Sequence, residues 1–227
     1  MTDTTRDMIS PIPASDSFHL GCSRRTVVAS LLATTALVFA DLRQLHAQAS
    51  TPPSGSVEVT PESAALLPRD VILTVEAVQE VIPEIAGEIA TGPNATVMGT
   101  PVANRAVLFA TADGAHRIVL SVDEYRSADD ASRYFNEALE ASRDVPGVTT
   151  EAVPDLGDAA LIGVVTQGDE THVGGGALFG TLIVNATLQA FEGTDENKAK
   201  VAELIRKQAE HAAMALGLAA ATPTGSS

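Results

Sequence analysis

The stretch "RAVLFATADGAHRIVLSVDEY", residues 105–125, carries the clearest fold signal in the chain. Two runs rich in Val, Ile and Leu flank the dipeptide Asp113-Gly114. A tight turn between antiparallel strands requires positive φ angles, which Asp-Gly adopts at little cost. We therefore predict a β-hairpin at this position.

A helix is predicted directly after the hairpin. Ser127 can cap it, and the acidic residues Asp129 and Asp130 fall in its first turn, where they meet the positive end of the helix dipole. Pro146-Gly147 is expected to end it. The predicted buried stripe consists of Ala131, Phe135, Ala138 and Leu139.

Four short apolar runs follow, at residues 148–153, 159–166, 171–179 and 181–191, and turn-forming residues separate them at 154–158 and 167–169. We predict four strands here. A last helix is expected from Thr194 or Asp195 to about Leu216. Its predicted buried residues are Val201, Leu204, Ile205 and Ala212.

The segment before the hairpin has a helical spacing of apolar residues. Thr74 can cap a helix whose buried face contains Val75, Val78, Ile82, Ile85 and Ile89. Pro83 interrupts this pattern, and a proline inside a helix costs about 3 kcal/mol. We therefore expect two short helical pieces with a break near Ile82.

The predicted order is helix, two strands, helix, four strands, helix. Because the links between strands are short, the sheet is expected to be mostly antiparallel. The predicted fold class is α+β, with a sheet of about five to six strands and helices packed on one face.

The N-terminal region has the organisation of an export signal. Arg24 and Arg25 precede an uncharged run of 14 residues, 27–40, which is shorter than the roughly 20 residues of a membrane span. The arginine pair resembles a twin-arginine signal, although Val27 and Val28 occupy positions where that pattern prefers Phe and Leu.

Cleavage is predicted after Ala49, because Ala47 and Ala49 form a small-x-small site; cleavage after Ala40, or retention as an anchor, is the alternative. The chain then divides into an export signal (1–49), a flexible linker (50–61), one domain (62–218) and a disordered tail (219–227). Extracellular or cell-envelope localisation is expected.

The formal net charge is −15, and residues 1–49 contain equal numbers of acidic and basic side chains, so the exported part carries all of it. Such a charge disfavours binding to nucleic acids and to anionic lipids. Contact with the membrane is expected only transiently, through the signal. The single cysteine, Cys22, precedes the apolar run, so the mature domain is predicted to have no disulfide or thiolate metal site.

The run "DEYRSADDASRYFNEALEASRDVPGVTTEAVPDLGDAALIG", followed by "GTLIVNATLQ" and a helix, resembles the extracellular sensor domains of PknH-type kinases and the LpqN-like envelope domains of actinobacteria. The resemblance lies in the helix with Phe135, the turn at residues 156–159 and the final strand and helix. It implies an envelope α+β domain with a concave surface, and it supplies no catalytic residues. The paired cysteines of those sensor domains are absent.

Local motifs predict little chemistry. Gly174, Gly175 and Gly176 lack the lysine and following helix of a phosphate loop, and are interpreted as a bulge or sheet edge that could open room for a ligand. Asp155 and Asp158 are interpreted as turn-stabilising residues; acid-base catalysis or Ca²⁺ binding is the alternative. His116, His172 and His211 lack the spacing of metal ligands.

No cofactor and no metal are predicted. The favoured function is non-enzymatic binding of a small apolar or amphiphilic ligand, or of an envelope protein, at a surface between the strands of residues 159–191 and a covering helix. A hydrolase with a spatially assembled carboxylate site and a purely structural envelope protein are the alternatives.

Overall fold

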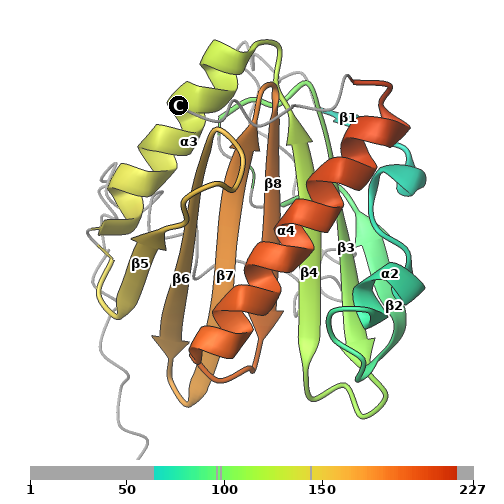
Figure 1. The fold of residues 1–227 in the computed structure, drawn as a ribbon, viewed down its shortest axis with the longest axis vertical. Helices are drawn as coiled ribbons and strands as arrows, with labels where there is room; N and C mark the ends of the chain where they lie inside the picture. The colour runs from blue at the N-terminus through green and yellow to red at the C-terminus, as the bar shows by residue number, and fades with distance from the viewer. Residues whose placement is uncertain (1–63, 96, 98, 144, 219–227) are drawn as a thin grey trace, which may run out of the picture.

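The structure is a computed structural model that describes residues 64–218, except 96, 98 and 144 (Figure 1). The predicted export signal with Arg24, Arg25, Ala47 and Ala49, the linker at 50–61 and the tail at 219–227 lie outside the described residues. The elements are β1 (Ala65–Leu66), the 3-10 helix η2 (Arg69–Val71), α2 (Val75–Gln79), β2 (Ile85–Gly92), β3 (Ala103–Thr111), β4 (Arg117–Glu124), α3 (Ala128–Arg143), β5 (Val148–Ala152), β6 (Ala159–Gln167), β7 (Glu170–Phe179), β8 (Leu182–Gln189) and α4 (Asp195–Ala215).

All described strands belong to one sheet. Its order is β1-β3-β4-β8-β7-β6-β5, and β2 also pairs with β3. Every pair is antiparallel except β1–β3, which is parallel. The predicted α+β class is confirmed, and β1 and β2 extend the expected six strands to an eight-stranded sheet.

The predicted hairpin is confirmed as β3–β4. Gly114 has a φ of 70°, which L-residues rarely adopt. The carboxylate of Asp113 accepts hydrogen bonds from the hydroxyl of Thr111 (2.5 Å) and from the backbone N–H of Ala115 (3.0 Å). The aspartate therefore stabilises the turn with its own side chain.

The second predicted helical piece is wrong, because residues 85–92 form the strand β2. α2 ends at Gln79, before Pro83, as the missing N–H of proline requires. Ile85 is 1% exposed but Ile89 is 59% exposed, so the two side chains do not share a buried face. Pairing with β3 outweighs the local helical spacing.

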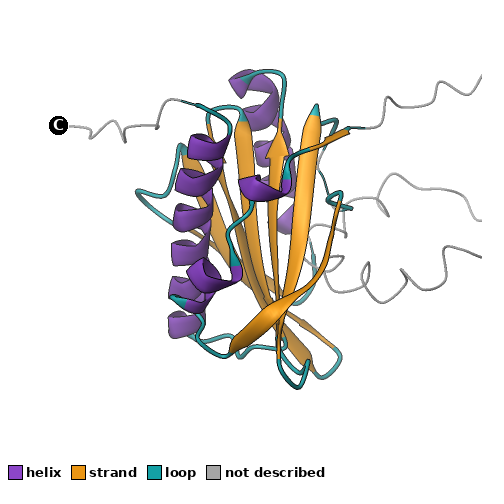
Figure 2. Cartoon of the chain, turned by 90° about the vertical axis from the view of Figure 1, so that its right-hand side faces the viewer, coloured by secondary structure: helices purple, strands orange, loops and turns teal. Residues whose placement is uncertain are grey.

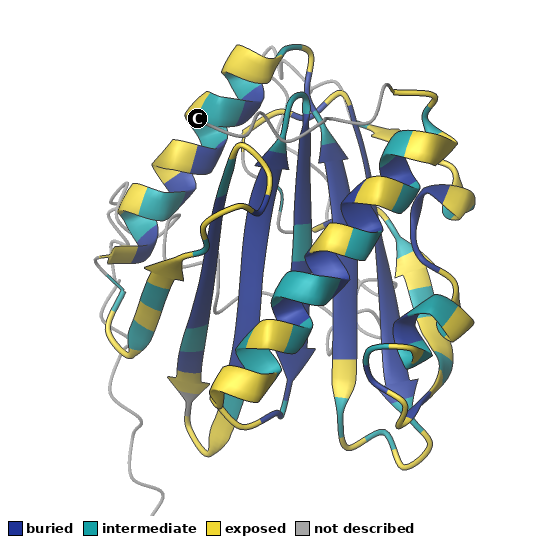
Figure 3. Cartoon of the chain, in the orientation of Figure 1, coloured by how far each residue is buried: buried dark blue, intermediate teal, exposed yellow. Residues whose placement is uncertain are grey.

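The main core lies between one face of the sheet and α4 (Figure 1). Figure 2 shows the sheet from its edge, with α4 along one side. Val201, Leu204, Ile205 and Ala212 of α4 are fully buried, as predicted, and Figure 3 shows buried residues alternating with exposed ones along this helix. This core includes the strand residues Phe109, Ile118, Leu120, Val173, Ala177, Val184 and Leu188.

α3 packs against the opposite face, whereas the helices were expected on one face. Phe135 clusters with Leu161, Leu178 and Ile183, which alternate along their strands with residues of the main core. Successive strand side chains point to opposite faces, so α3 and α4 lie on different sides of the sheet. The apolar pattern of α3 predicted its buried stripe but contains no information about which face it covers.

Gln208 connects α4 to the segment before α2. Its side chain is fully buried. The amide oxygen accepts a hydrogen bond from the backbone N–H of Leu73 (3.0 Å), and the amide nitrogen donates to the carbonyl of Val71 (2.7 Å). One side chain therefore satisfies two backbone groups that would otherwise be buried without partners.

Candidate functional site

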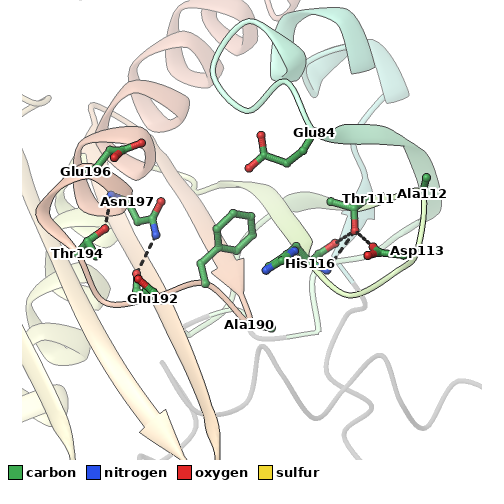
Figure 4. Close-up of a pocket in the computed structure, with 11 residues that line it drawn as sticks. Glu84, Thr111, Ala112, Asp113, His116, Ala190, Glu192, Thr194, Glu196 and Asn197 are labelled. Atoms are coloured by element: carbon green, nitrogen blue, oxygen red, sulfur yellow. Dashed lines mark hydrogen bonds between the residues drawn. The ribbon is translucent and has the colours of Figure 1, made fainter.

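A cavity of about 720 Å³ lies at one end of the sheet, beside the β3–β4 turn. Figure 4 shows the side chains that line it. They come from three separate segments: Glu84 before β2, the hairpin turn at residues 111–116, and the connection from β8 into α4 at residues 190–197. We call this the rim cavity.

The rim cavity has an aromatic wall formed by His116 and Phe191. Their ring centroids are 4.8 Å apart, with planes inclined by 54°. Phe191 is 7% exposed and also belongs to the main core, so the core fixes its position. The half-buried His116 ring and the small exposed part of Phe191 give the cavity an apolar side against which a ligand can pack.

Four carboxylates surround this wall: Glu84, Asp113, Glu192 and Glu196. All four are exposed. Glu196 pairs with Lys200 at 2.8 Å, and its hydrogen bond with this lysine lowers its pKa. Within the described part of the chain, the other three form no ion pair. Their charges are available to a positively charged ligand.

Asp113 is held in its ionised form by the turn. The hydrogen bond from Thr111, followed by that from the N–H of Ala115, lowers the pKa of Asp113. A lowered pKa suits a fixed negative charge and is unfavourable for a general acid near neutral pH. The carboxylate can attract a cation, and it is a poor proton donor.

Hydrogen bonds fix the backbone at the start of α4, where it borders the cavity. Thr194 caps α4 by accepting a hydrogen bond from the N–H of Asn197 (3.2 Å), and the Asn197 side chain donates to the carbonyl of Glu192 (2.8 Å). Ala190 has a φ of 62°, a left-handed conformation that costs a non-glycine residue about 1–2 kcal/mol. Such strain is found preferentially at functional sites.

A second concentration of polar groups lies on the sheet face opposite α4, around Asp123. Asp123 is 2% exposed. Its carboxylate accepts hydrogen bonds from the side-chain amide of Asn94 (2.9 and 3.0 Å) and from that of Asn185 (3.3 Å). Both amides also donate to the hydroxyl of Ser121 at 3.2 Å. We call these four residues the Asp123 cluster.

The two asparagines of this cluster begin the only Asn-x-Thr motifs of the sequence, at residues 94–96 and 185–187. Asn94 is 7% exposed and Asn185 is partly buried, and both side chains are engaged with Asp123. Their chemistry is therefore internal hydrogen bonding.

The three glycines proposed as a ligand surface lie in β7, which pairs regularly with β6 and β8. The interpretation as a bulge or sheet edge is therefore wrong. A Cβ on Gly175 would lie 2.5 Å from the carbonyl oxygen of Leu161, and one on Gly176 would lie 2.5 Å from Oδ1 of Asn185. Gly174 has a similar contact, 3.0 Å from Oγ1 of Thr187. The glycines accommodate neighbouring groups of the sheet.

Asp155 and Asp158 lie in the exposed β5–β6 connection, away from the residues that line the rim cavity. The carboxylate of Asp158 accepts a hydrogen bond from the backbone N–H of Gly180 (2.7 Å), which links two connections of the sheet. Asp155 has a φ of 61°. A role of either residue in ligand binding stays a prediction.

The surface predicted between residues 159–191 and a covering helix is filled on both faces: the main core lies under α4, and the cluster of Phe135 with Leu161, Leu178 and Ile183 lies under α3. Val173, Ala177, Val184 and Ala186 are fully buried in the main core. Within residues 64–218, apart from the three undescribed positions, no group of three or more His, Cys, Asp or Glu residues is placed to hold a metal ion. Nor does this part of the chain contain a helix long and apolar enough to cross a membrane.

Comparison with known proteins gives weak structural similarity alone. No family model matches the chain, and no curated protein matches it in sequence. The extracellular domain of PknH from Mycobacterium tuberculosis aligns with a TM-score of 0.45 and 10% identity, over 61% of this chain and 92% of that domain. A GTP binding regulator from Thermotoga maritima aligns with a TM-score of 0.35 and 9% identity, over 60% of this chain and 89% of that protein. No function is transferred from either.

Proposed function

We propose that this chain is an exported, non-enzymatic domain that binds a small amphiphilic ligand carrying a positive charge. The observation that supports the binding role is the rim cavity, where the His116–Phe191 wall lies among carboxylates that, Glu196 excepted, form no salt bridge within the described part of the chain. Small-molecule sites combine a concave shape and apolar or aromatic surface with polar groups that fix the ligand; the rim cavity is concave and has the aromatic wall, and most of its other lining residues are polar.

The sign of the ligand charge follows from electrostatics. The chain has a net charge of −15, and the rim cavity concentrates four carboxylates within this negative field. Such a field raises the local concentration of cations and repels anions. Because all four side chains are exposed, each contributes modestly and is screened by salt. The proposed affinity therefore depends on the aromatic wall as well as on charge.

The first test is calorimetric titration of the full chain at low ionic strength with three probes of one shape: 2-phenylethylammonium, 2-phenylethanol and phenylacetate. We expect the affinity order cation, alcohol, anion. The double substitution Glu84→Gln and Glu192→Gln should weaken binding of the cation by about threefold to tenfold, since exposed ion pairs contribute about 0.2–1 kcal/mol each.

Glu140→Gln serves as the matched control, because Glu140 is an exposed carboxylate on α3, outside the cavity lining. It removes a charge without touching the cavity, so its affinity for the cation should equal that of the wild type within a factor of two or so. Equal affinity for cation and alcohol, or a cation affinity that the double substitution leaves unchanged, contradicts the proposal.

Export through the twin-arginine route is the second part of the proposal, and it rests on Arg24, Arg25 and the apolar run at 27–40. Replacing both arginines by lysine keeps the charge and removes the guanidinium pair. The precursor should then stay in the cytoplasm of the producing cell, as detected by fractionation and immunoblotting. Undiminished export of this variant contradicts the route. The exported form should begin at Ser50, and a start at Asp41 would place cleavage after Ala40.

A further inference from the structure

A second cavity, of about 460 Å³, lies between α4 and the turn that follows α2. Figure 1 shows α2 beside α4. Glu80 and Val81 form one wall of this cavity, and the other wall is one face of α4, whose residues recur at spacings of three and four. These α4 residues are Glu196, Ala199, Lys200, Glu203 and Lys207. We call this cavity the helix groove.

The helix groove continues the rim cavity. Glu196 lines both cavities on the side of α4. On the opposite side, Glu80 and Val81 line the groove, and Glu84, at the end of the same turn, lines the rim cavity. The two cavities therefore share a border, and a ligand bound in one can extend into the other.

The charges of the two cavities differ. In the groove, Lys200 pairs with Glu196 and Lys207 pairs with Glu80, both at 2.8 Å. The third carboxylate of the groove, Glu203, is paired with an arginine within α4. The rim cavity has three carboxylates that form no ion pair in the described part of the chain. A cationic group is therefore attracted to the rim cavity, and the groove, whose charges are paired, suits an uncharged group.

Apolar surface is available between these ion pairs. Val81 is half-buried and packs against the main core, so its position is fixed. Ala199 is exposed, and its small side chain leaves space in the groove. Lys200 and Lys207 line the groove with their ammonium groups held by carboxylates, which leaves their alkyl stems for apolar contact. Covering such a surface with hydrocarbon is favourable, because it removes apolar area from water.

We propose that the helix groove holds the uncharged hydrocarbon tail of the cationic ligand whose head lies in the rim cavity. This inference rests on the proposed function, and it narrows the ligand class to amphiphiles with one positive head and a linear chain. From Glu196 to Lys207 the axis of α4 rises by about 16 Å, which exceeds the length of an extended octyl chain.

The test is calorimetric titration of the full chain with butylammonium, hexylammonium and octylammonium, which carry the same head and differ in chain length. A fully buried methylene raises affinity about fourfold, and a surface groove covers only part of each methylene, so we expect about twofold per methylene. Octylammonium should therefore bind roughly tenfold more tightly than butylammonium.

Ala199→Gln places a longer, neutral and polar side chain in the groove, and it should reduce this tenfold gain to about twofold or less. Ala215→Gln makes the same change at an exposed position of α4 outside the groove, and it should retain the wild-type gain. In ¹⁵N-labelled protein, octylammonium should shift the amide signals of Val81 and Ala199 more than butylammonium does.

The outcomes separate this inference from the proposed function. If butylammonium binds and octylammonium gains nothing, or if Ala199→Gln keeps the full gain, the tail does not lie in the groove and the inference is overturned, while the proposed function stands. If none of the three amines binds, the proposed function is contradicted and the inference fails with it.

Discussion

Leu204→Ala and Phe135→Ala are each expected to lower the free energy of unfolding by about 2–5 kcal/mol. Leu204 is fully buried in the main core on the α4 face, and Phe135 is 5% exposed in the cluster under α3 on the opposite face. Each truncation removes apolar contacts and leaves a cavity that the surrounding sheet can fill only in part. The loss is a large share of the 5–15 kcal/mol that stabilises a typical domain.

Guanidinium chloride denaturation of the full chain measures this loss. Met214→Ala is the matched control, because Met214 is on α4 and 74% exposed, and it should change stability by less than about 0.5 kcal/mol. Wild-type midpoints for both core variants would show that the buried faces of α3 and α4 are assigned wrongly.

Gln208→Leu is expected to destabilise the domain by about 2–4 kcal/mol although it makes the core more apolar. The leucine has a similar volume, but it leaves the N–H of Leu73 and the carbonyl of Val71 buried without their partner. A buried polar group without a hydrogen bond costs about 1–3 kcal/mol. The loss of the two bonds should therefore outweigh the gain in apolar burial.

Thermal and denaturant unfolding of Gln208→Leu should be compared with Glu210→Ala, an exposed position of the same helix two residues later. Glu210→Ala should be nearly neutral. A Gln208→Leu variant as stable as the wild type would mean that water or a backbone shift replaces both hydrogen bonds, and that Gln208 does not secure the segment before α2.

Local sequence signals predicted most elements of the domain correctly. The Asp113-Gly114 turn predicted the hairpin because its backbone requirement is met by those two residues alone. Ser127 and Thr194 predicted the starts of α3 and α4, where both hydroxyls accept a backbone N–H from the first turn. These features depend on residues close together in the chain.

Features that depend on distant residues could not be predicted in the same way. Ile85 follows the helical spacing of Val78 and Ile82, and it lies in a strand because the edge of β3 is available for pairing. The central position of β8 beside β4, and the placement of α3 on the second face, are likewise set by tertiary packing. Propensity and periodicity contain no information about them.

The candidate site was missed for the same reason. Glu84, Asp113 and Glu192 belong to three segments that only the folded sheet brings to one end. Asp113 was recognised as a turn residue, and its second role in the cavity had no local signal. Asp123 lies in β4 and Asn185 in the adjacent strand β8, and both side chains are on the sheet face opposite α4. The two residues are about 60 positions apart in the sequence. Their hydrogen bond becomes visible in the tertiary structure alone.

The most direct test of the proposed binding function is to map where the cationic probe binds. Backbone amide shifts of the ¹⁵N-labelled full chain should be recorded during titration with 2-phenylethylammonium at low ionic strength. If the probe binds in the rim cavity, the largest saturable changes in amide chemical shift should fall at residues 111–116, at residues 190–197 and around Glu84. Shifts that centre on Gly174, Gly175 and Gly176 in β7, or the absence of saturable shifts at millimolar probe, would contradict binding in this cavity.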